Sequence, residues 1–153
     1  MADVPILEEV TWTGDGMGTT REAFFREIAV RLPTNLPRVE VADAVICTLA
    51  ERLSGGVVDR ILSELPESLR PLLRPYAKPI EAQAKGFDKD EFYMAVAEHL
   101  NVDPTDVRRI ISAVFSALHS QITEATSERV ASQLPDELSS TWIAARHGVS
   151  APH

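Results

Sequence analysis

The chain has 153 residues, of which 44% are hydrophobic and 25% charged, and its formal net charge is −8. This length can bury one core of moderate size, and the composition is that of an ordinary globular protein. The excess of acidic residues argues against nucleic-acid binding, because that affinity rests largely on lysine and arginine contacts with phosphate. The single cysteine, Cys47, excludes an intramolecular disulfide, and we predict that it is a buried structural thiol.

Residues 1–19 carry Pro5, glycines and acids without a sustained hydrophobic period, which predicts an extended or mobile N-terminal arm. Trp12 is the large aromatic residue of this arm, and it could hold the arm against the body of the protein or against a partner. The arm has neither the basic start nor the apolar stretch of a signal peptide, and no run approaches the ~18 to 20 apolar residues of a membrane span. We therefore expect a cytoplasmic protein that does not bind membranes.

Residues 20–74 are predicted to form a first unit of about four helices. Thr20 is a suitable cap for a helix over residues 21–31, in which apolar residues recur at a spacing of three to four. A second helix, the longest of the unit, is expected over residues 38–53.

A third helix is predicted to follow Ser54, whose hydroxyl can cap it after a tight bend. Gly55 and Gly56 come next, and they lower helix stability but permit a close turn. The second unit makes the corresponding bend without glycine, so the glycines are not essential to it. The helix should end at Leu65, because a residue before proline is pushed out of the helical region. Pro66 then starts a short fourth helix.

Residues 75–87 are predicted to connect this unit to a second one. Prolines and a glycine interrupt the segment. Residues 80–85 are expected to form one short linking helix within it. The connector should therefore carry some regular structure.

Residues 88–142 are predicted to form the second unit. Asp88 can cap its first helix in a capping box with the glutamate three residues later. Asp103 as a cap and Pro104 in the first helical position predict the start of a long helix that covers residues 105–121. The apolar residues of this helix keep an i, i+3, i+4 rhythm, which indicates one broad buried face.

The end of the second unit follows the same plan as the first. Thr123 is the equivalent of Ser54 as a helix cap, and Leu134 precedes a proline. A short fourth helix is expected after that proline, and the segment that begins at Trp142 could extend it. Residues 143–153 are predicted to fray as a C-terminal tail.

The two units share an internal duplication. Residues 63–69 return, with several changes, as residues 132–138, 69 positions later. The retained positions are chiefly apolar or mark helix ends, so the duplication predicts architecture more than chemistry. Each unit would be marginally stable alone. We therefore predict an all-α fold in which two tandem units of about four helices each pack as one pseudo-twofold bundle.

The helix pattern resembles that of a known bacterial family. Residues 44–53 of the long helix and residues 63–66 with the Leu-Pro break carry the likeness, and the second unit repeats it less closely. The family is the one catalogued as domain of unknown function 2267, and the likeness covers about residues 21–142. It implies a duplicated all-helical fold and a cytoplasmic bacterial setting. It implies no activity, cofactor or catalytic residue.

Familiar catalytic signatures are missing from the sequence. It contains no glycine-rich phosphate loop, Cys-X-X-Cys pair, His-Glu-X-X-His helix or Gly-X-Ser-X-Gly elbow. His99 and His119 lie near predicted helix ends, and the remaining two histidines lie in the tail. These positions fit solvated side chains better than metal ligands, which need three or four donors to converge. We predict no catalytic residue, no metal site and no cofactor.

Arg60 and Arg129 are the candidate pocket residues. Each lies about one turn before a Leu-Pro break and has an acidic residue beside it. Two equivalent arginines near a pseudo-twofold axis could grip a carboxylate. Each could instead bond carbonyl groups at the broken helix end, or an acid across the bundle.

Two functions stay open on the sequence. The leading hypothesis is a non-enzymatic adaptor that binds another protein through an exposed groove or its terminal arms, with Trp12 and Trp142 as anchors, since tryptophan is enriched among binding hot spots. Each tryptophan could instead pack on its own domain. The alternative is a small-ligand or metal-binding protein, with or without enzymatic activity, whose pocket between the units is lined by Arg60, Arg129 and histidines. A homodimer is compatible with both.

Overall fold

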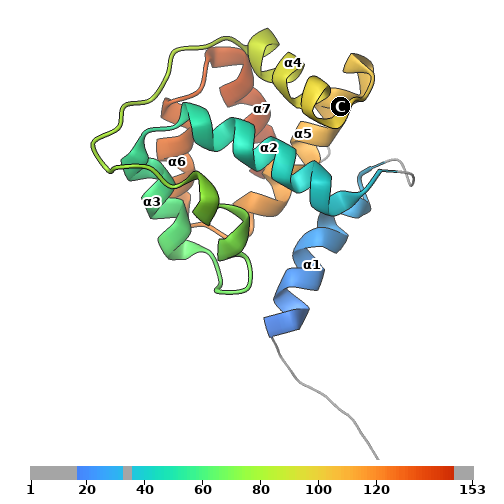
Figure 1. The fold of residues 1–153 in the computed structure, drawn as a ribbon, viewed down its shortest axis with the longest axis horizontal. Coiled ribbons are helices and arrows are strands. Elements are labelled where there is room, and N and C mark those ends of the chain that lie inside the picture. The colour runs from blue at the N-terminus through green and yellow to red at the C-terminus, as the bar shows by residue number, and fades with distance from the viewer. Residues whose placement is uncertain (1–16, 33–35, 147–153) are drawn as a thin grey trace, which may run out of the picture.

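The computed structural model describes residues 17–32 and 36–146, and every regular element within those ranges is a helix. The predicted all-α class is therefore confirmed. Figure 1 shows the arrangement. In chain order the elements are α1 (Met17–Ala29), α2 (Arg38–Arg52), α3 (Gly55–Glu64), the 3-10 helices η1 (Arg70–Leu72) and η2 (Arg74–Tyr76), α4 (Lys89–Leu100), α5 (Pro104–His119), α6 (Glu124–Ser132) and α7 (Asp136–Arg146).

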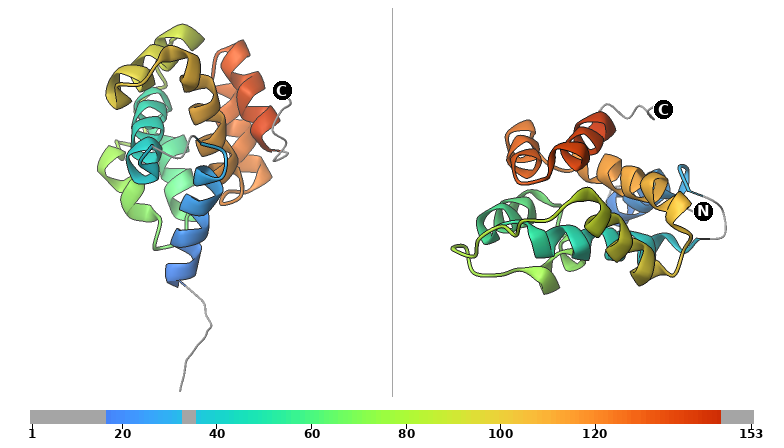
Figure 2. Two further views of the ribbon diagram at one scale, coloured as in Figure 1. Left: turned by 90° about the vertical axis from the view of Figure 1, so that its right-hand side faces the viewer. Right: turned by 90° about the horizontal axis from the view of Figure 1, so that it is seen from above.

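Helix α5 lies at the centre of the molecule. Figure 2 shows α6 and α7 on one side of it and α2 and α4 on the other. The sequence pattern indicated one broad buried face, and the first half of α5 fits it, since Arg108 and Arg109 are exposed. The second half is enclosed on almost all sides, because every residue from 113 to 118 is buried. The buried hydrophobic residues form one continuous core that extends from Phe24 in α1 to Ala145 in α7.

The predicted helix caps are largely confirmed. Asp88 and Glu91 form a reciprocal capping box at the start of α4, and Asp103 caps α5 with Pro104 in the first helical position. Ser54 and Thr123 each accept a hydrogen bond from the backbone N–H three residues later. Local side-chain chemistry therefore sets the starts of four helices.

Helix α1 begins earlier than predicted. It starts at Met17, so Thr20 lies inside the helix and is not its cap. Residues 17–19 of the predicted arm belong to α1, and residues 1–16 lie outside the described residues. The apolar spacing marked only the part of the helix that packs against the core, which begins near Phe24.

The predicted short helix after Pro66 is wrong for the first half of the chain. Leu65 ends α3 in an extended conformation with its side chain buried, as expected, but the chain then forms a turn and the short helices η1 and η2. Pro71 and Pro75 explain the difference, because a proline inside a helix removes a backbone donor and clashes with the preceding turn. The segment after Pro135 has no such interruption and forms the full helix α7.

The predicted linking helix over residues 80–85 is also wrong. This segment makes a turn and then runs without regular structure, and its backbone bonds to the corner between α2 and α3. Gly55 N–H donates to the carbonyl of Ala82 at 2.9 Å, and Lys85 N–H donates to the carbonyl of Arg52 at 3.0 Å. The connector satisfies its backbone groups by tertiary contacts, so a local helix is not needed.

Gly55 has a role in packing that the sequence did not reveal. A Cβ atom at this position would overlap the carbonyl group of Pro79, in the connector. The glycine therefore admits the connector backbone, and is not required by the bend itself. Thr123 makes the corresponding bend and is followed by Glu124.

None of the described helices is long and apolar enough to cross a bilayer.

Candidate functional site

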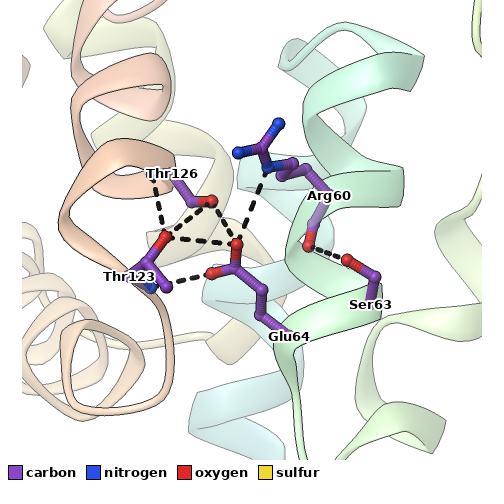
Figure 3. Close-up of polar contacts among 5 residues, drawn as sticks. All are labelled: Arg60, Ser63, Glu64, Thr123 and Thr126. Atoms are coloured by element: carbon purple, nitrogen blue, oxygen red, sulfur yellow. Dashed lines mark hydrogen bonds and ion pairs between the residues drawn. The ribbon is translucent and has the colours of Figure 1, made fainter.

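Helices α3 and α6 pack with the end of each beside the beginning of the other. Glu64, at the end of α3, reaches across to α6 (Figure 3). Its Oε1 accepts the backbone N–H of Thr123 at 2.7 Å, and its Oε2 accepts the hydroxyls of Thr126 at 2.6 Å and Thr123 at 3.2 Å. Burial alone would raise the pKa of Glu64, but these hydrogen bonds and the nearby Arg60 outweigh it and hold the pKa below its ordinary value.

A matching contact lies at the other end of the same helix pair. Gln133, directly after α6, accepts the backbone N–H of Ser54 at 2.9 Å, and its Nε2 donates to the Ser54 hydroxyl at 2.9 Å. Ser54 and Thr123 are the N-caps of α3 and α6. Each N-cap residue is thus hydrogen-bonded by the side chain at the end of the opposite helix. This bond satisfies the backbone N–H of the cap, which has no partner within its own helix.

The two candidate arginines, Arg60 and Arg129, are both exposed residues. The Nε of Arg60 lies 3.7 Å from Glu64 Oε2 on the same helix, and the Arg60 side chain is 45% exposed. Arg129 is an exposed residue of α6. In the part of the chain that the structure describes, neither the groove between α2 and α4 nor the small void in the core is lined by Arg60 or Arg129.

Trp142 belongs to the core, since only 1% of it is exposed. Its Nε1–H lies within hydrogen-bonding distance of the carbonyl oxygen of Ser127 at 3.1 Å and of its hydroxyl at 3.0 Å. Its ring packs against those of Phe115 and His119, with centroids 4.9 and 4.0 Å away. Packing on its own domain, the alternative to an anchor role, is therefore what the structure shows for Trp142. Trp12 lies outside the described residues.

His119 is not the solvated helix-end histidine that the sequence suggested. Its Nε2 lies 2.7 Å from the carbonyl oxygen of Trp142, and its Nδ1 lies 3.1 Å from the Ser127 hydroxyl. The ring therefore links α5, α6 and α7. Sequence spacing could not reveal this role, because the three residues come from different helices.

The thiol of Cys47 is half-buried, less enclosed than predicted. Burial raises the pKa of Cys47, and the neighbouring carboxylate of Glu51 raises it further. The thiol is therefore protonated at neutral pH, which makes it a poor nucleophile. Close by, the hydroxyl of Tyr76 donates to Asp43 at 2.8 Å.

A surface groove lies between the start of α2, η1 and the end of α4, and we call it the α2–α4 groove. Its volume is about 460 Å³. All three elements contribute apolar residues to its lining. Helix α2 also contributes two carboxylates, and α4 contributes one imidazole. The lining residues are Val39, Glu40, Asp43, Pro71, Leu72, His99 and Leu100.

A second cavity is enclosed in the core and has a volume of only about 20 Å³. Its lining is entirely apolar and includes Phe24, Leu49 and Leu118. A void of this size has room for about one water molecule, and apolar walls offer that water no hydrogen bonds. It is a small apolar void that offers a polar ligand no hydrogen-bonding partner.

The model of one protein family matches residues 30–141 of the chain. The family is described as an uncharacterized conserved protein, DUF2267. The chain belongs to the DUF2267 family. A comparison with curated proteins found no match.

The DUF2267 match contains both the α3–α6 contact and the α2–α4 groove. It extends from the end of α1 to the middle of α7, so it includes the α3–α6 contact and every residue that lines the α2–α4 groove. Among the described residues, no three histidine, cysteine, aspartate or glutamate side chains are grouped as metal ligands would be. The α2–α4 groove is therefore the candidate functional site.

Proposed function

We propose that this DUF2267 protein is a non-enzymatic module that binds another protein through the α2–α4 groove. The observation that carries the proposal is an open groove of about 460 Å³ whose apolar lining is bordered by carboxylates. Val39 stands at its edge and is 47% exposed. Covering exposed apolar surface of this kind favours association, at about 25 cal/mol for each Å² removed from water.

The walls of the groove are anchored in the core, which supports the same proposal. Val41 and Ala42 follow Glu40 in α2 and are fully buried, and Val96 and Ala97 hold the end of α4 in the core. Leu72 itself is almost entirely buried. A groove that is formed before binding loses little conformational entropy when a partner enters, so more of the contact energy appears as affinity.

We also propose that residues 20–74 and 88–142 are two units packed as one pseudo-twofold bundle. The α3–α6 contacts support this arrangement, because Ser54 and Thr123 are 69 positions apart, and so are Glu64 and Gln133. The bond from Glu64 to the Thr123 cap thus corresponds to the bond from Gln133 to the Ser54 cap. In the same way α1 packs on α5, while α4 packs on α2.

The test of the binding function uses photo-crosslinking in the source cells. We expect a benzoylphenylalanine at Val39 to crosslink one discrete partner, while the same group at Ile143, which is 49% exposed on α7, does not. The partner should then be identified and purified, and it should bind the Val39→Ser chain more weakly than the wild-type chain, because this change removes apolar surface without adding charge. Equal crosslinking at both positions, none at either, or crosslinking only to a second copy of the chain would contradict the proposal.

A further inference from the structure

We infer that the α2–α4 groove recognises a segment of a partner protein that carries an arginine or lysine beside an apolar side chain. The inference rests on the proposed binding function and adds the chemistry of the partner. It starts from the two carboxylates of the groove, Glu40 and Asp43. Within residues 17–32 and 36–146, neither of them has an ion-pair partner.

Asp43 is positioned to receive a cation. Its Oδ1 accepts the hydroxyl of Tyr76 at 2.8 Å, which orients the carboxylate and leaves Oδ2 for another donor. The residue is half-buried. A hydrogen bond from a guanidinium or ammonium group is stronger at such a partly desolvated carboxylate than at an exposed one.

Glu40 lies one turn before Asp43 on α2 and is exposed at the rim. Two carboxylates at this spacing lie on the same face of a helix. They share the groove with apolar surface contributed by the exposed Pro71 and the half-buried Leu100. A partner side chain that is long and cationic can therefore reach the carboxylates while its apolar neighbour fills the floor.

The fold itself does not require acids at these positions. In the proposed pseudo-twofold arrangement, the residues 69 positions after Glu40 and Asp43 are Arg109 and Ser112. The long helix thus tolerates a cation or a small neutral residue at the corresponding places. The pair of carboxylates is therefore not repeated at the corresponding positions of the second unit, as expected for a recognition feature.

The probe is a short fluorescein-labelled peptide of alternating leucine and arginine, compared with the same peptide in which citrulline replaces arginine. Citrulline keeps the shape of arginine and removes its charge. Binding is measured by fluorescence polarisation, and its location by backbone amide shifts in NMR spectra. We expect the arginine peptide to shift the amides of Val39 and Leu100 and to bind at least about tenfold more tightly than the citrulline peptide.

The protein variants are Glu40→Gln with Asp43→Asn, and Glu98→Gln as a control that removes one carboxylate outside the groove. Glu98 is exposed on α4 outside the groove lining. The groove variant should lose at least about tenfold in affinity, while the control should keep it. The Asp43→Asn change should leave the fold intact, because the amide oxygen of asparagine can still accept from Tyr76.

Three results would overturn the inference. If the citrulline peptide occupies the groove as tightly as the arginine peptide, the groove binds apolar segments regardless of charge, and the proposed function stands without this chemistry. If Glu98→Gln weakens binding as much as the groove variant, the attraction is that of any cation for an acidic protein. If neither peptide shifts the groove amides, a basic apolar segment is not the ligand, and the crosslinking experiment decides separately whether the groove binds a protein.

Discussion

Replacing Gly55 with alanine places a methyl group where the backbone of the connector lies. The new Cβ would overlap the carbonyl oxygen of Pro79, and it would be 2.7 Å from the carbonyl carbon and 3.1 Å from the Cα of Ile80. These are backbone atoms, so the connector can relieve the overlap only by moving away from α3. That movement breaks or lengthens the hydrogen bonds from Gly55 N–H to Ala82 and from Lys85 N–H to Arg52.

The size of the effect follows from these contacts. Each lost hydrogen bond costs about 1 kcal/mol, and displacing packed groups costs about 1 to 3 kcal/mol. Alanine recovers at most about 1 kcal/mol of helix propensity relative to glycine. We therefore expect Gly55→Ala to lower the free energy of unfolding by about 2 to 4 kcal/mol.

Gly56→Ala is the matched control in the same turn of α3. Its Cβ would lie 3.8 Å from the carbonyl oxygen of Ile80 and 3.9 Å from the Ile80 side chain, which is ordinary van der Waals contact. This variant should be unchanged or more stable by up to about 1 kcal/mol, because alanine favours the helix.

The assay is urea unfolding followed by circular dichroism, with the midpoints compared at equal m value. The midpoint of Gly55→Ala should fall well below that of Gly56→Ala. Limited proteolysis should also cut the connector of Gly55→Ala faster, because its backbone is less protected. Equal midpoints for the two alanine variants would refute the close packing of the connector against α3.

Three further predictions concern the polar groups of the structure. Trp142→Phe keeps an aromatic ring in the core but removes the N–H beside Ser127, so the free energy of unfolding in urea should fall by about 1 to 3 kcal/mol; an unchanged value would contradict the hydrogen bond. The pKa of Glu64 is lower in the folded protein than its ordinary value of 4.5, so the ionised carboxylate stabilises the fold above that pH. This stabilisation is lost as the pH falls through the pKa of the folded protein. The difference in free energy of unfolding between wild type and Glu64→Gln should therefore shrink from pH 6 to pH 3. A pH-independent difference would show that the charge of Glu64 is not responsible. Cys47 should react with a disulfide reagent at pH 8 more slowly than a free thiol, and Glu51→Gln should speed the reaction, because burial and then Glu51 raise the thiol pKa.

Local signals in the sequence predicted the helices that depend on nearby residues. The caps at Asp88, Asp103 and Thr123 involve hydrogen bonds that span two or three positions, so the sequence contains both partners. The apolar spacing of α5 likewise predicted a buried helix, although its second half is buried on more than one face. The missing helix after Pro66 could have been predicted, since Pro71 and Pro75 are visible in the sequence.

The candidate site could not be predicted in the same way. The α2–α4 groove combines α2 near Glu40, η1 at Leu72 and α4 at Leu100, and no short-range pattern relates these positions. Trp142 was predicted as an anchor from the statistical enrichment of tryptophan at interfaces. Its burial depends instead on contacts with Phe115 and His119, which lie in another helix.

The sequence by itself therefore determined the all-helical class, most helix boundaries and the family, because hydrophobic period, caps and proline breaks act over a few residues. Only the tertiary structure decided the path of the connector, the burial of Trp142 and the position of the groove. Each of these depends on contacts between residues far apart in the chain, such as Gly55 with Ala82 and Trp142 with Ser127. Packing and backbone hydrogen bonding select among local conformations of nearly equal energy, and that choice is made only when the distant partner is in place.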